Sequence, residues 1–277
     1  MIRDIKRALM LTLTSPIKPG SIHRFMPEIE FEERIVEAIE VFDIIDESHK
    51  RGRELALGNI DLGSLGLGHL ISTAYKKSFE IINERPIPGI AAAAIVLSSI
   101  DGYSEALKQN VINNIGSFLS KLLYKGKPND TVEFIESLED LGLSNYISLL
   151  EKANINKNYI EYEGRTLGDI FEVLSKIDAG FMINIKDYSN LLKLSKLITN
   201  SKNAIHASIK SYIYIGKDLY KINDFSDLDI NDPNLLNKLS SKDKVLKRNR
   251  EDLNSILGGV LITLYLALNY ENPLRLF

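Results

Sequence analysis

The sequence contains no cysteine, and this absence excludes several kinds of protein. Disulfide-stapled scaffolds, thiolate zinc sites, iron–sulfur clusters and enzymes with a thiol nucleophile all need cysteine. Proline, with 8 residues, and glycine, with 17, are too few for a low-complexity chain of 277 residues. The chain must therefore be held together by an ordinary hydrophobic core, and it is long enough to bury one.

A strong excess of charge of either sign is also missing. The chain has 34 Lys+Arg against 37 Asp+Glu, which gives a net charge of −3 at pH 7 with histidine neutral. Proteins that bind nucleic acid usually carry a strongly basic domain or face. We therefore expect no nucleic-acid partner.

Long hydrophobic runs are scarce as well. The longest apolar run, 256–268, is shorter than the ~20 residues that a bilayer span requires, and Gly258 and Gly259 interrupt it. The apolar stretch that follows the charged N-terminus is short and lacks the cleavage pattern of a signal peptide. We expect a cytoplasmic protein with no membrane partner.

Helical periodicity dominates what is present. Over 27–50, apolar residues recur at spacings of three and four, at Phe31, Ile35, Ile39, Phe42 and Ile45. This spacing predicts an amphipathic helix. Similar patterns predict further helices, including 130–153 and 249–270, without a fixed-period repeat and without a flexible linker. The sequence therefore predicts an all-α protein, with about ten helices in a single domain that spans 1–277.

The segment 15–24, which we call the motif loop, is the most informative part of the sequence. Its two prolines stiffen the chain, and Gly20 permits a turn or a close approach to a ligand. Lys18, His23 and Arg24 supply cations, and Ser21 supplies a further hydrogen-bond donor. Such donors suit a polyphosphate. The alternative is a surface turn between two helices that happens to be basic.

The segment 58–63, which we call the distal turn, is the second candidate. Asn59 is suited to cap a helix whose N–H groups would face an anion. Asp61 is suited to hold a magnesium ion, and Gly63 permits a close approach of the backbone. The alternative is ordinary capping together with helix packing mediated by glycine.

These two segments resemble motifs of the triphosphoribosyl-dephospho-CoA synthase family, in particular its archaeal branch. The family carries a Lys-Pro-Gly-x-x-His-Arg type motif, which stands intact here at 18–24. Its Gly-Asn-Thr-x-x-Gly type motif corresponds to 58–63, with Ile60 in place of threonine. The apolar segment 264–268 also resembles the last helix of the family. The order of elements matches over nearly the whole chain.

The resemblance implies an all-α transferase that uses ATP and Mg²⁺. ATP would donate its triphosphoribosyl group to a ribose hydroxyl of 3′-dephospho-CoA or of a related acceptor, and adenine would leave. The resemblance assigns phosphate or nucleotide binding to Lys18, Gly20, Ser21, His23, Arg24, Asn59 and Gly63, and the metal ion to Asp61. The expected partners are these small molecules, with a homodimer as the expected assembly if the chain is not monomeric.

Two departures from the family pattern bear on catalysis. A family carboxylate in the second half corresponds here to Lys202 or, with a slip of one residue, to Asn203. A second family carboxylate, near the last helix, corresponds to Asn254 when the match has no gap and to Asp252 when a gap is allowed. No residue is singled out as the general base. The alternative function is therefore a divergent nucleotide-binding protein of the same fold with impaired catalysis.

The other charged and histidine residues favour structural roles. His49, His69 and His206 form no pair at a metal-ligand spacing, and His69 is expected in the core. The acidic residues between 43 and 47 and the basic run 242–250 are expected to be solvated helix faces.

Overall fold

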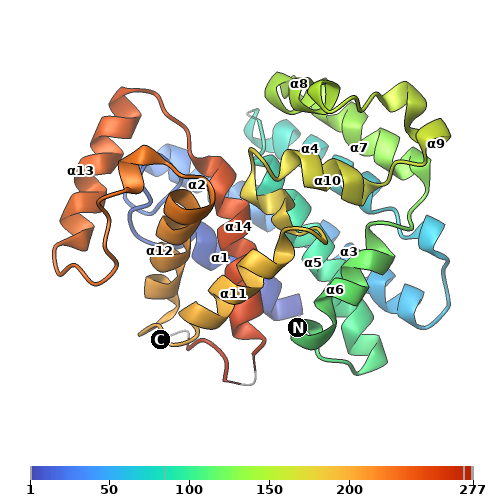
Figure 1. Ribbon diagram of the computed structural model, residues 1–277, viewed down its shortest axis with the longest axis horizontal. Coiled ribbons are helices and arrows are strands. Elements are labelled where there is room, and N and C mark those ends of the chain that lie inside the picture. The colour runs from blue at the N-terminus through green and yellow to red at the C-terminus, as the bar shows by residue number, and fades with distance from the viewer. Residues whose placement is uncertain (1, 84, 271, 276–277) are drawn as a thin grey trace.

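The structure is a computed structural model that describes residues 2–83, 85–270 and 272–275 (Figure 1). Every regular element in these residues is a helix, so the expected all-α fold of about ten helices is confirmed. The apolar side chains of these helices form one continuous buried core.

The helices of the first half run from the N-terminus to a long buried helix and its two successors. They are α1 (Ile2–Thr14), α2 (Glu28–Glu40), α3 (Phe42–Ala56), α4 (Leu67–Ile82), α5 (Pro88–Leu107), α6 (Val111–Leu122) and α7 (Pro128–Asp140). The second half contains α8 (Ser144–Lys152), α9 (Ile160–Glu163), α10 (Leu167–Leu174), α11 (Tyr188–Ile198), α12 (Ala204–Tyr214), α13 (Leu235–Arg248) and α14 (Leu257–Leu268). Short 3-10 turns join several of them, including η1 (Leu62–Ser64), η3 (Ala179–Met182) and η6 (Asn254–Ile256).

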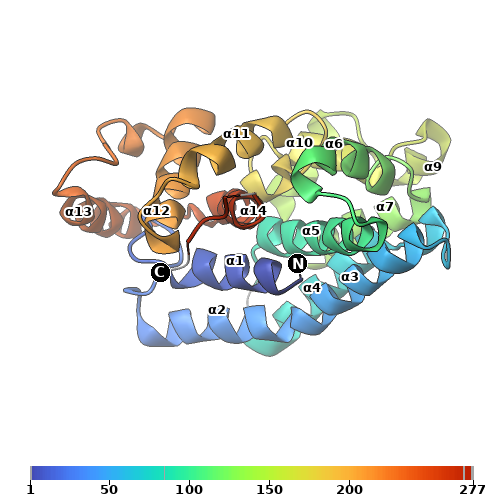
Figure 2. The ribbon, with the colours of Figure 1, turned by 90° about the horizontal axis from the view of Figure 1, so that it is seen from below.

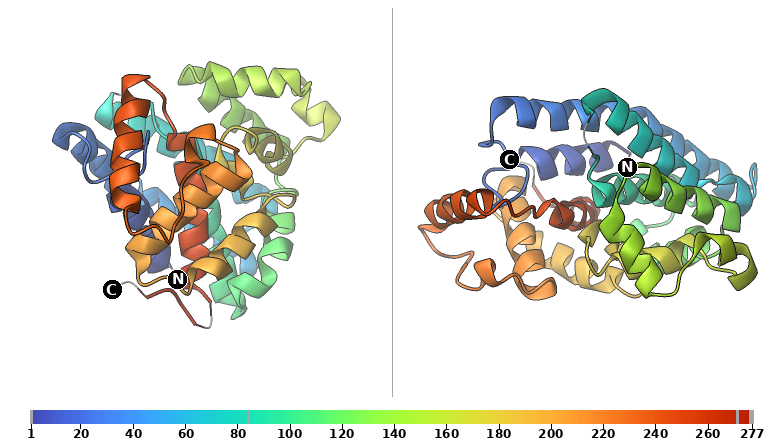
Figure 3. Two further views of the ribbon diagram at one scale, coloured as in Figure 1. Left: turned by 60° about the vertical axis from the view of Figure 1, so that its left-hand side comes forward. Right: turned by 90° about the horizontal axis from the view of Figure 1, so that it is seen from above.

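Helices α5 and α14 occupy the middle of the molecule. Helices α1, α3 and α4 pack against α5 on one side, while α6 and α11 cover the pair on the other side (Figure 2). Both central helices are apolar on all faces, as expected for helices that are surrounded by others. Helix α13 and the α8–α9 segment lie at opposite ends of the molecule (Figure 3).

Helix α5 has the length and apolar character of a membrane-spanning helix, yet it is a core helix here. It has 20 residues, and 83% of its most apolar window is buried inside the protein. Its four-alanine run, 91–94, lets neighbouring helices approach closely. This burial is the pattern of a core helix.

The structure has more helix boundaries than the periodicity predicts. The helix expected over 27–50 is interrupted at Val41, where α2 ends and α3 begins. The helix expected over 130–153 is divided by Gly142, whose φ of +62° is incompatible with a right-handed helix. The last helix begins at Leu257 rather than near 249, because 249–253 form a loop that follows the separate helix α13.

Candidate functional site: a central cleft beside the motif loop

The motif loop and the distal turn lie at opposite ends of the molecule. The motif loop joins α1 to α2 at the α13 end, and the distal turn follows α3 at the other end (Figure 2). The structure therefore does not bring Lys18, His23 and Arg24 together with Asn59. The expectation that the two segments form one phosphate pocket is not met.

The distal turn has a structural role in its own neighbourhood. Asn59 and Asp61 are exposed, and the Asp61 carboxylate accepts a hydrogen bond from the Ser64 backbone N–H at 2.7 Å, so it caps η1. Gly63 packs against the side chain of Lys127. After the turn, Gly68 lets the start of α4 lie close to α7, because a Cβ on Gly68 would overlap the Asp130 carbonyl.

In the motif loop, Lys18 is buried rather than presented to a ligand. Its side chain is fully enclosed, and its ammonium donates a hydrogen bond to the Ser15 carbonyl at 3.3 Å. Burial lowers the pKa of Lys18 to about 7, because a desolvated ammonium is unfavourable. The cation that the motif supplies at the surface is instead Arg24, which is exposed.

His23 and Gly20 attach the motif loop to helix α13. The Asp243 carboxylate accepts a hydrogen bond from the Gly20 N–H at 3.0 Å and lies 3.2 Å from Nε2 of His23. Lys247 lies 2.9 Å from the same carboxylate. Burial lowers the pKa of His23, with the positive charges of Lys247 and Lys18 acting in the same direction. Burial opposes ionisation of Asp243, but these partners outweigh it and its pKa is lowered.

Ser21 attaches the motif loop to the beginning of the last helix. The Asn254 side-chain oxygen accepts hydrogen bonds from the Ser21 hydroxyl at 2.9 Å and from the Ile22 N–H at 3.0 Å. The buried Tyr212 hydroxyl donates to the Pro19 carbonyl at 2.6 Å. The position at which the family pattern expects a carboxylate therefore holds the amide that anchors the motif loop.

On its other side, Asn254 lines a cleft of about 510 Å³, which we call the central cleft. The cleft lies where α2, the segment before α5, the beginning of α8 and the beginning of η6 meet. It is lined by Arg34, Arg85, Pro86, Ile87, Pro88, Leu143, Asn145, Tyr146, Ile177, Asp252, Asn254 and Ser255. Its volume is in the range of small-molecule binding sites.

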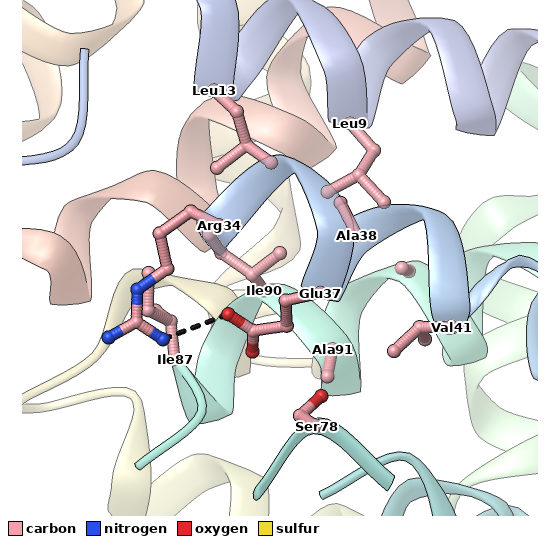
Figure 4. A pocket seen from close by; sticks show the side chains of 11 residues that line it. Leu9, Leu13, Arg34, Glu37, Ala38, Val41, Ser78, Ile87, Ile90 and Ala91 are labelled. Atoms are coloured by element: carbon pink, nitrogen blue, oxygen red, sulfur yellow. Dashed lines mark hydrogen bonds and ion pairs between the residues drawn. The ribbon is translucent and has the colours of Figure 1, made fainter. Parts of the chain in front are cut away.

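Two arginines supply positive charge to the central cleft. Arg34 donates to the Glu37 carboxylate at 2.9 Å and to the Arg85 carbonyl at 3.2 Å, so its guanidinium is held in place. The same side chain borders a small apolar cavity of about 30 Å³ between α1, α2 and α5, beside Ile87 (Figure 4). That cavity holds little more than a water molecule, so the central cleft is the larger binding space.

Two helices begin at the central cleft and add to its positive potential. Ile87 and Pro88 form the start of α5, and Leu143 and Asn145 form the start of α8. The N-terminal end of a helix carries a partial positive charge, although at the start of α5 Pro88 has no N–H and the Gly89 N–H already donates to Asp178. Together with the two arginines, these ends make the cleft suitable for an anion such as phosphate.

A buried carboxylate lies directly behind Tyr146, one of the cleft residues. Asp178 accepts hydrogen bonds from the Tyr146 hydroxyl at 2.8 Å, from the Gly89 N–H at 3.0 Å and from the Gly180 N–H at 2.9 Å. Burial raises the pKa of Asp178 to about 6, although these three donors act to lower it. Asp178 thus joins the beginning of α5 to η3.

Glycines make this junction possible. A Cβ on Gly180 would overlap the Gly89 carbonyl, and a Cβ on Gly258 would overlap the backbone of Gly180. The start of α5, η3 and the start of α14 therefore touch through their backbones. The wall of the central cleft is consequently a rigid junction of three elements.

The structure also places the residues that correspond to the two family carboxylates. Asp252 and Asn254, the two alternative positions of the second carboxylate in the resemblance, both line the central cleft. Asp252 also accepts a hydrogen bond from the Asn254 N–H at 2.8 Å. Asn203 caps α12 through the His206 N–H, while Lys202 is exposed.

Arg34, Arg85, Tyr146 and Asp178 were not identified from the sequence. Each is separated from the motifs along the chain, and the only local signal is the pair of prolines at 86 and 88, which breaks the helical pattern. His69 also differs from expectation: it is exposed and pairs with Glu133 at 2.7 Å instead of lying in the core.

Comparison with protein-family models, with curated proteins and with solved structures finds no match to this chain.

Proposed function

We propose that the protein is a transferase of the triphosphoribosyl-dephospho-CoA synthase type, and that ATP binds in the central cleft. The observation that carries the proposal is the position of Asn254. It anchors the intact Lys-Pro-Gly-x-x-His-Arg motif on one side and lines a cleft with two arginines on the other. The motif loop then acts as a support for the cleft wall, and the distal turn takes no part in ATP binding.

The charges in the central cleft suit the triphosphate and the ribose of ATP. The triphosphate would lie against Arg34, Arg85 and the helix N-termini, where its negative charge is compensated. Asp252 would face the ribose, where positive charge develops as the bond to adenine breaks. Arg24 remains a predicted phosphate contact from the motif loop.

The transfer requires one bond to form and one to break. A hydroxyl oxygen of the acceptor attacks the anomeric carbon of ATP, and the bond from that carbon to the adenine nitrogen breaks. The hydroxyl proton passes to a base, and adenine takes up a proton as it leaves. Dephospho-CoA or a related alcohol would be the acceptor.

The residues of the central cleft fit a magnesium ion carried by the nucleotide. Mg²⁺ is commonly held by one or two carboxylates together with substrate phosphates and water. Asp252 supplies one carboxylate, whereas the Asn254 oxygen already accepts two hydrogen bonds. When bound, the ion would neutralise triphosphate charge.

Adenine release tests the activity directly. Pure protein is incubated with ATP, Mg²⁺ and dephospho-CoA, and free adenine is measured by chromatography. The proposal predicts adenine release that depends on the acceptor. No release over a range of enzyme concentrations would contradict the transferase function.

ATP binding tests the location of the site. Arg85→Ala removes an exposed cleft cation, and we expect it to weaken ATP binding about 10-fold or more, as loss of a charge-assisted contact does. Asp61→Asn is the matched control, because it changes one charge on the distal turn and should leave the affinity unchanged. If calorimetry shows that Asp61→Asn weakens ATP binding and Arg85→Ala does not, the ATP site lies at the distal turn instead.

The replacement of a carboxylate by Asn254 favours a second candidate, a nucleotide-binding protein without transferase activity. It predicts ATP binding in the same cleft without adenine release. Calorimetry with and without Mg²⁺ separates the two. Binding that tightens with the metal ion supports the transferase, and metal-independent binding supports the second candidate.

A further inference from the structure

A second cluster of chemically active side chains lies near the other end of α5, away from the central cleft. In the part of the chain that the structure describes, His49, Asp101 and Glu105 are the one group of three His, Asp or Glu side chains close enough to share a metal ion. Their ligand atoms all lie within 4.8 Å of one another. We call these three residues the His49 cluster.

The His49 cluster contains buried polar atoms that have no hydrogen-bond partner. Asp101 is 2% exposed and His49 is 8% exposed. Nε2 of His49 and Oδ2 of Asp101 both lack a hydrogen bond, although they lie 3.2 Å apart. Buried polar atoms are nearly always satisfied, and two neighbouring atoms without a hydrogen bond indicate a missing partner such as an ion.

The spacing of the donors suits a metal ion between them. Nε2 of His49 lies 3.2 Å from the Asp101 carboxylate and 3.4 Å from the Glu105 carboxylate. Donors that are each about 2.1 Å from one ion are about 3.0–3.4 Å apart in octahedral or tetrahedral coordination. The two separations from His49 fall in this range.

The helices that carry the cluster are held rigidly together. His49 lies on α3, while Asp101 and Glu105 lie one turn apart on α5. A Cβ on Gly102 would overlap the His49 carbonyl, so the two backbones touch beside the cluster. The same two helices are also joined by the Ser48 hydroxyl, which donates a hydrogen bond to the Ile95 carbonyl at 2.7 Å. Such a scaffold fixes the ligand positions before an ion binds.

A hydrogen bond from a neighbouring helix orients the buried carboxylate. The Tyr265 hydroxyl, from α14, donates to Oδ1 of Asp101 at 2.8 Å. Tyr265 is fully buried, so its hydroxyl has Asp101 rather than solvent as its partner. Oδ2 of Asp101 therefore stays turned toward His49. Such outer contacts are typical of metal sites in proteins.

Access and electrostatics agree with this arrangement. Asp101 and Glu105 also line a cavity of about 450 Å³, and Glu105 is partly exposed. Both residues lie close to the C-terminal end of α5, where the helix dipole favours a cation. Arg53 lies 3.8 Å from Oε1 of Glu105, the oxygen that does not face His49, and its side chain is half exposed.

We propose that His49, Asp101 and Glu105 bind one divalent transition-metal ion of the Zn²⁺ or Co²⁺ kind. An imidazole with two carboxylates is a donor set that such ions accept. Three protein ligands leave at least one coordination position open toward the cavity, where water or a small oxyanion binds. This site is independent of the central cleft and of the function proposed for it.

Metal titration of the full chain tests the proposal. After treatment with a chelator and its removal, Zn²⁺ is added in a calorimeter, and Co²⁺ is followed by its visible absorption. We expect one ion per chain and a higher melting temperature with Zn²⁺. Glu105→Gln, at a partly exposed position, should weaken binding by about 10-fold or more, and His49→Gln should do the same.

His69→Gln is the matched control, because His69 with Glu133 is an exposed histidine–carboxylate pair that can capture metal adventitiously. It should leave the affinity unchanged. Circular dichroism checks the folding of each variant, and if His49→Gln does not fold, Glu105→Gln decides. The proposal is overturned if the wild-type chain does not bind stoichiometrically, if Glu105→Gln binds as tightly as wild type, or if His69→Gln removes the binding.

Discussion

The two ends of helix α5 differ in the charge that they present. At its N-terminal end, Ile87 and Pro88 border the central cleft, which contains Arg34 and Arg85. Near its C-terminal end, the helix carries Asp101 and Glu105 beside His49. One end is suited to an anion and the other to a cation, in the sense that the helix dipole favours.

The comparison shows how one buried helix can serve two separate sites. Pro88 and Asp101 are about 20 Å apart along α5, at 1.5 Å per residue. Both ends are fixed by backbone contacts at glycine, Gly89 with Gly180 at the cleft and Gly102 with His49 at the cluster. Each site should therefore respond to changes at its own end.

Gly180→Ala should have the largest effect. Its Cβ would overlap the Gly89 carbonyl, a backbone atom that cannot move without shifting α5. We expect a loss of at least about 3 kcal/mol in the free energy of unfolding, measured by urea denaturation. Gly126→Ala is the control, because nothing lies within 4 Å of its added Cβ. Equal stabilities of the two variants would contradict a tight junction at the cleft.

Lys18→Met should raise stability near neutral pH. The pKa of Lys18 is lowered from 10.5 to about 7 in the folded state. Between these values the unfolded chain binds more protons, so wild-type stability rises with pH and is lost as pH falls toward 7. This lowering of the Lys18 pKa corresponds to a loss of up to about 5 kcal/mol in the free energy of unfolding at pH 7. Allowing for relaxation and for the lost hydrogen bond to Ser15, we expect a gain of about 2–3 kcal/mol at pH 7.

The measurement is urea denaturation of both proteins at pH 7 and pH 10. The advantage of Lys18→Met should shrink at the higher pH, and its affinity for ATP should equal that of wild type. A variant that is less stable than wild type at pH 7 and has lost ATP binding would instead make Lys18 a phosphate ligand.

Asn254→Ala should release the motif loop from the cleft wall. It leaves the Ile22 N–H and the Ser21 hydroxyl without their acceptor, which costs about 1–2 kcal/mol. Asn254→Asp keeps an acceptor oxygen and should retain most of this stability. Thermal melting and ATP titration of both variants measure the difference. If alanine is tolerated as well as aspartate, the anchor has no role.

Asn59→Ala should have the smallest effect. Asn59 is exposed on the distal turn and belongs neither to the central cleft nor to the His49 cluster. We expect a change within about 0.5 kcal/mol and unaltered binding of ATP and of Zn²⁺. A loss of ATP binding would restore the shared pocket that the two motifs suggest.

The helical architecture follows from local information and was predictable. The period of apolar residues identifies α1, which buries residues spaced by three and four, whereas α5 and α14 are marked by nearly continuous apolar runs. The break at Val41 was not predictable, since neither proline nor glycine marks it. The rigidity of the motif loop was expected, but its partner Asn254 is 232 residues away from Ile22.

The two candidate sites needed the three-dimensional structure for the same reason. The central cleft combines Arg34, Arg85 and Asp252, which no local spacing connects. The His49 cluster has one local signal, the four-residue spacing of Asp101 and Glu105 on a helix. Its histidine lies on a different helix, so a search for histidine pairs in the sequence does not find it.

Calorimetric titration of Arg85→Ala and Glu105→Gln, each with ATP and separately with Zn²⁺, tests the central claim most directly. The two-ended account of α5 predicts that Arg85→Ala weakens ATP binding and keeps Zn²⁺ binding. It predicts that Glu105→Gln does the reverse. If either variant loses both ligands while remaining folded, or if both variants bind both ligands as wild type does, the account is contradicted.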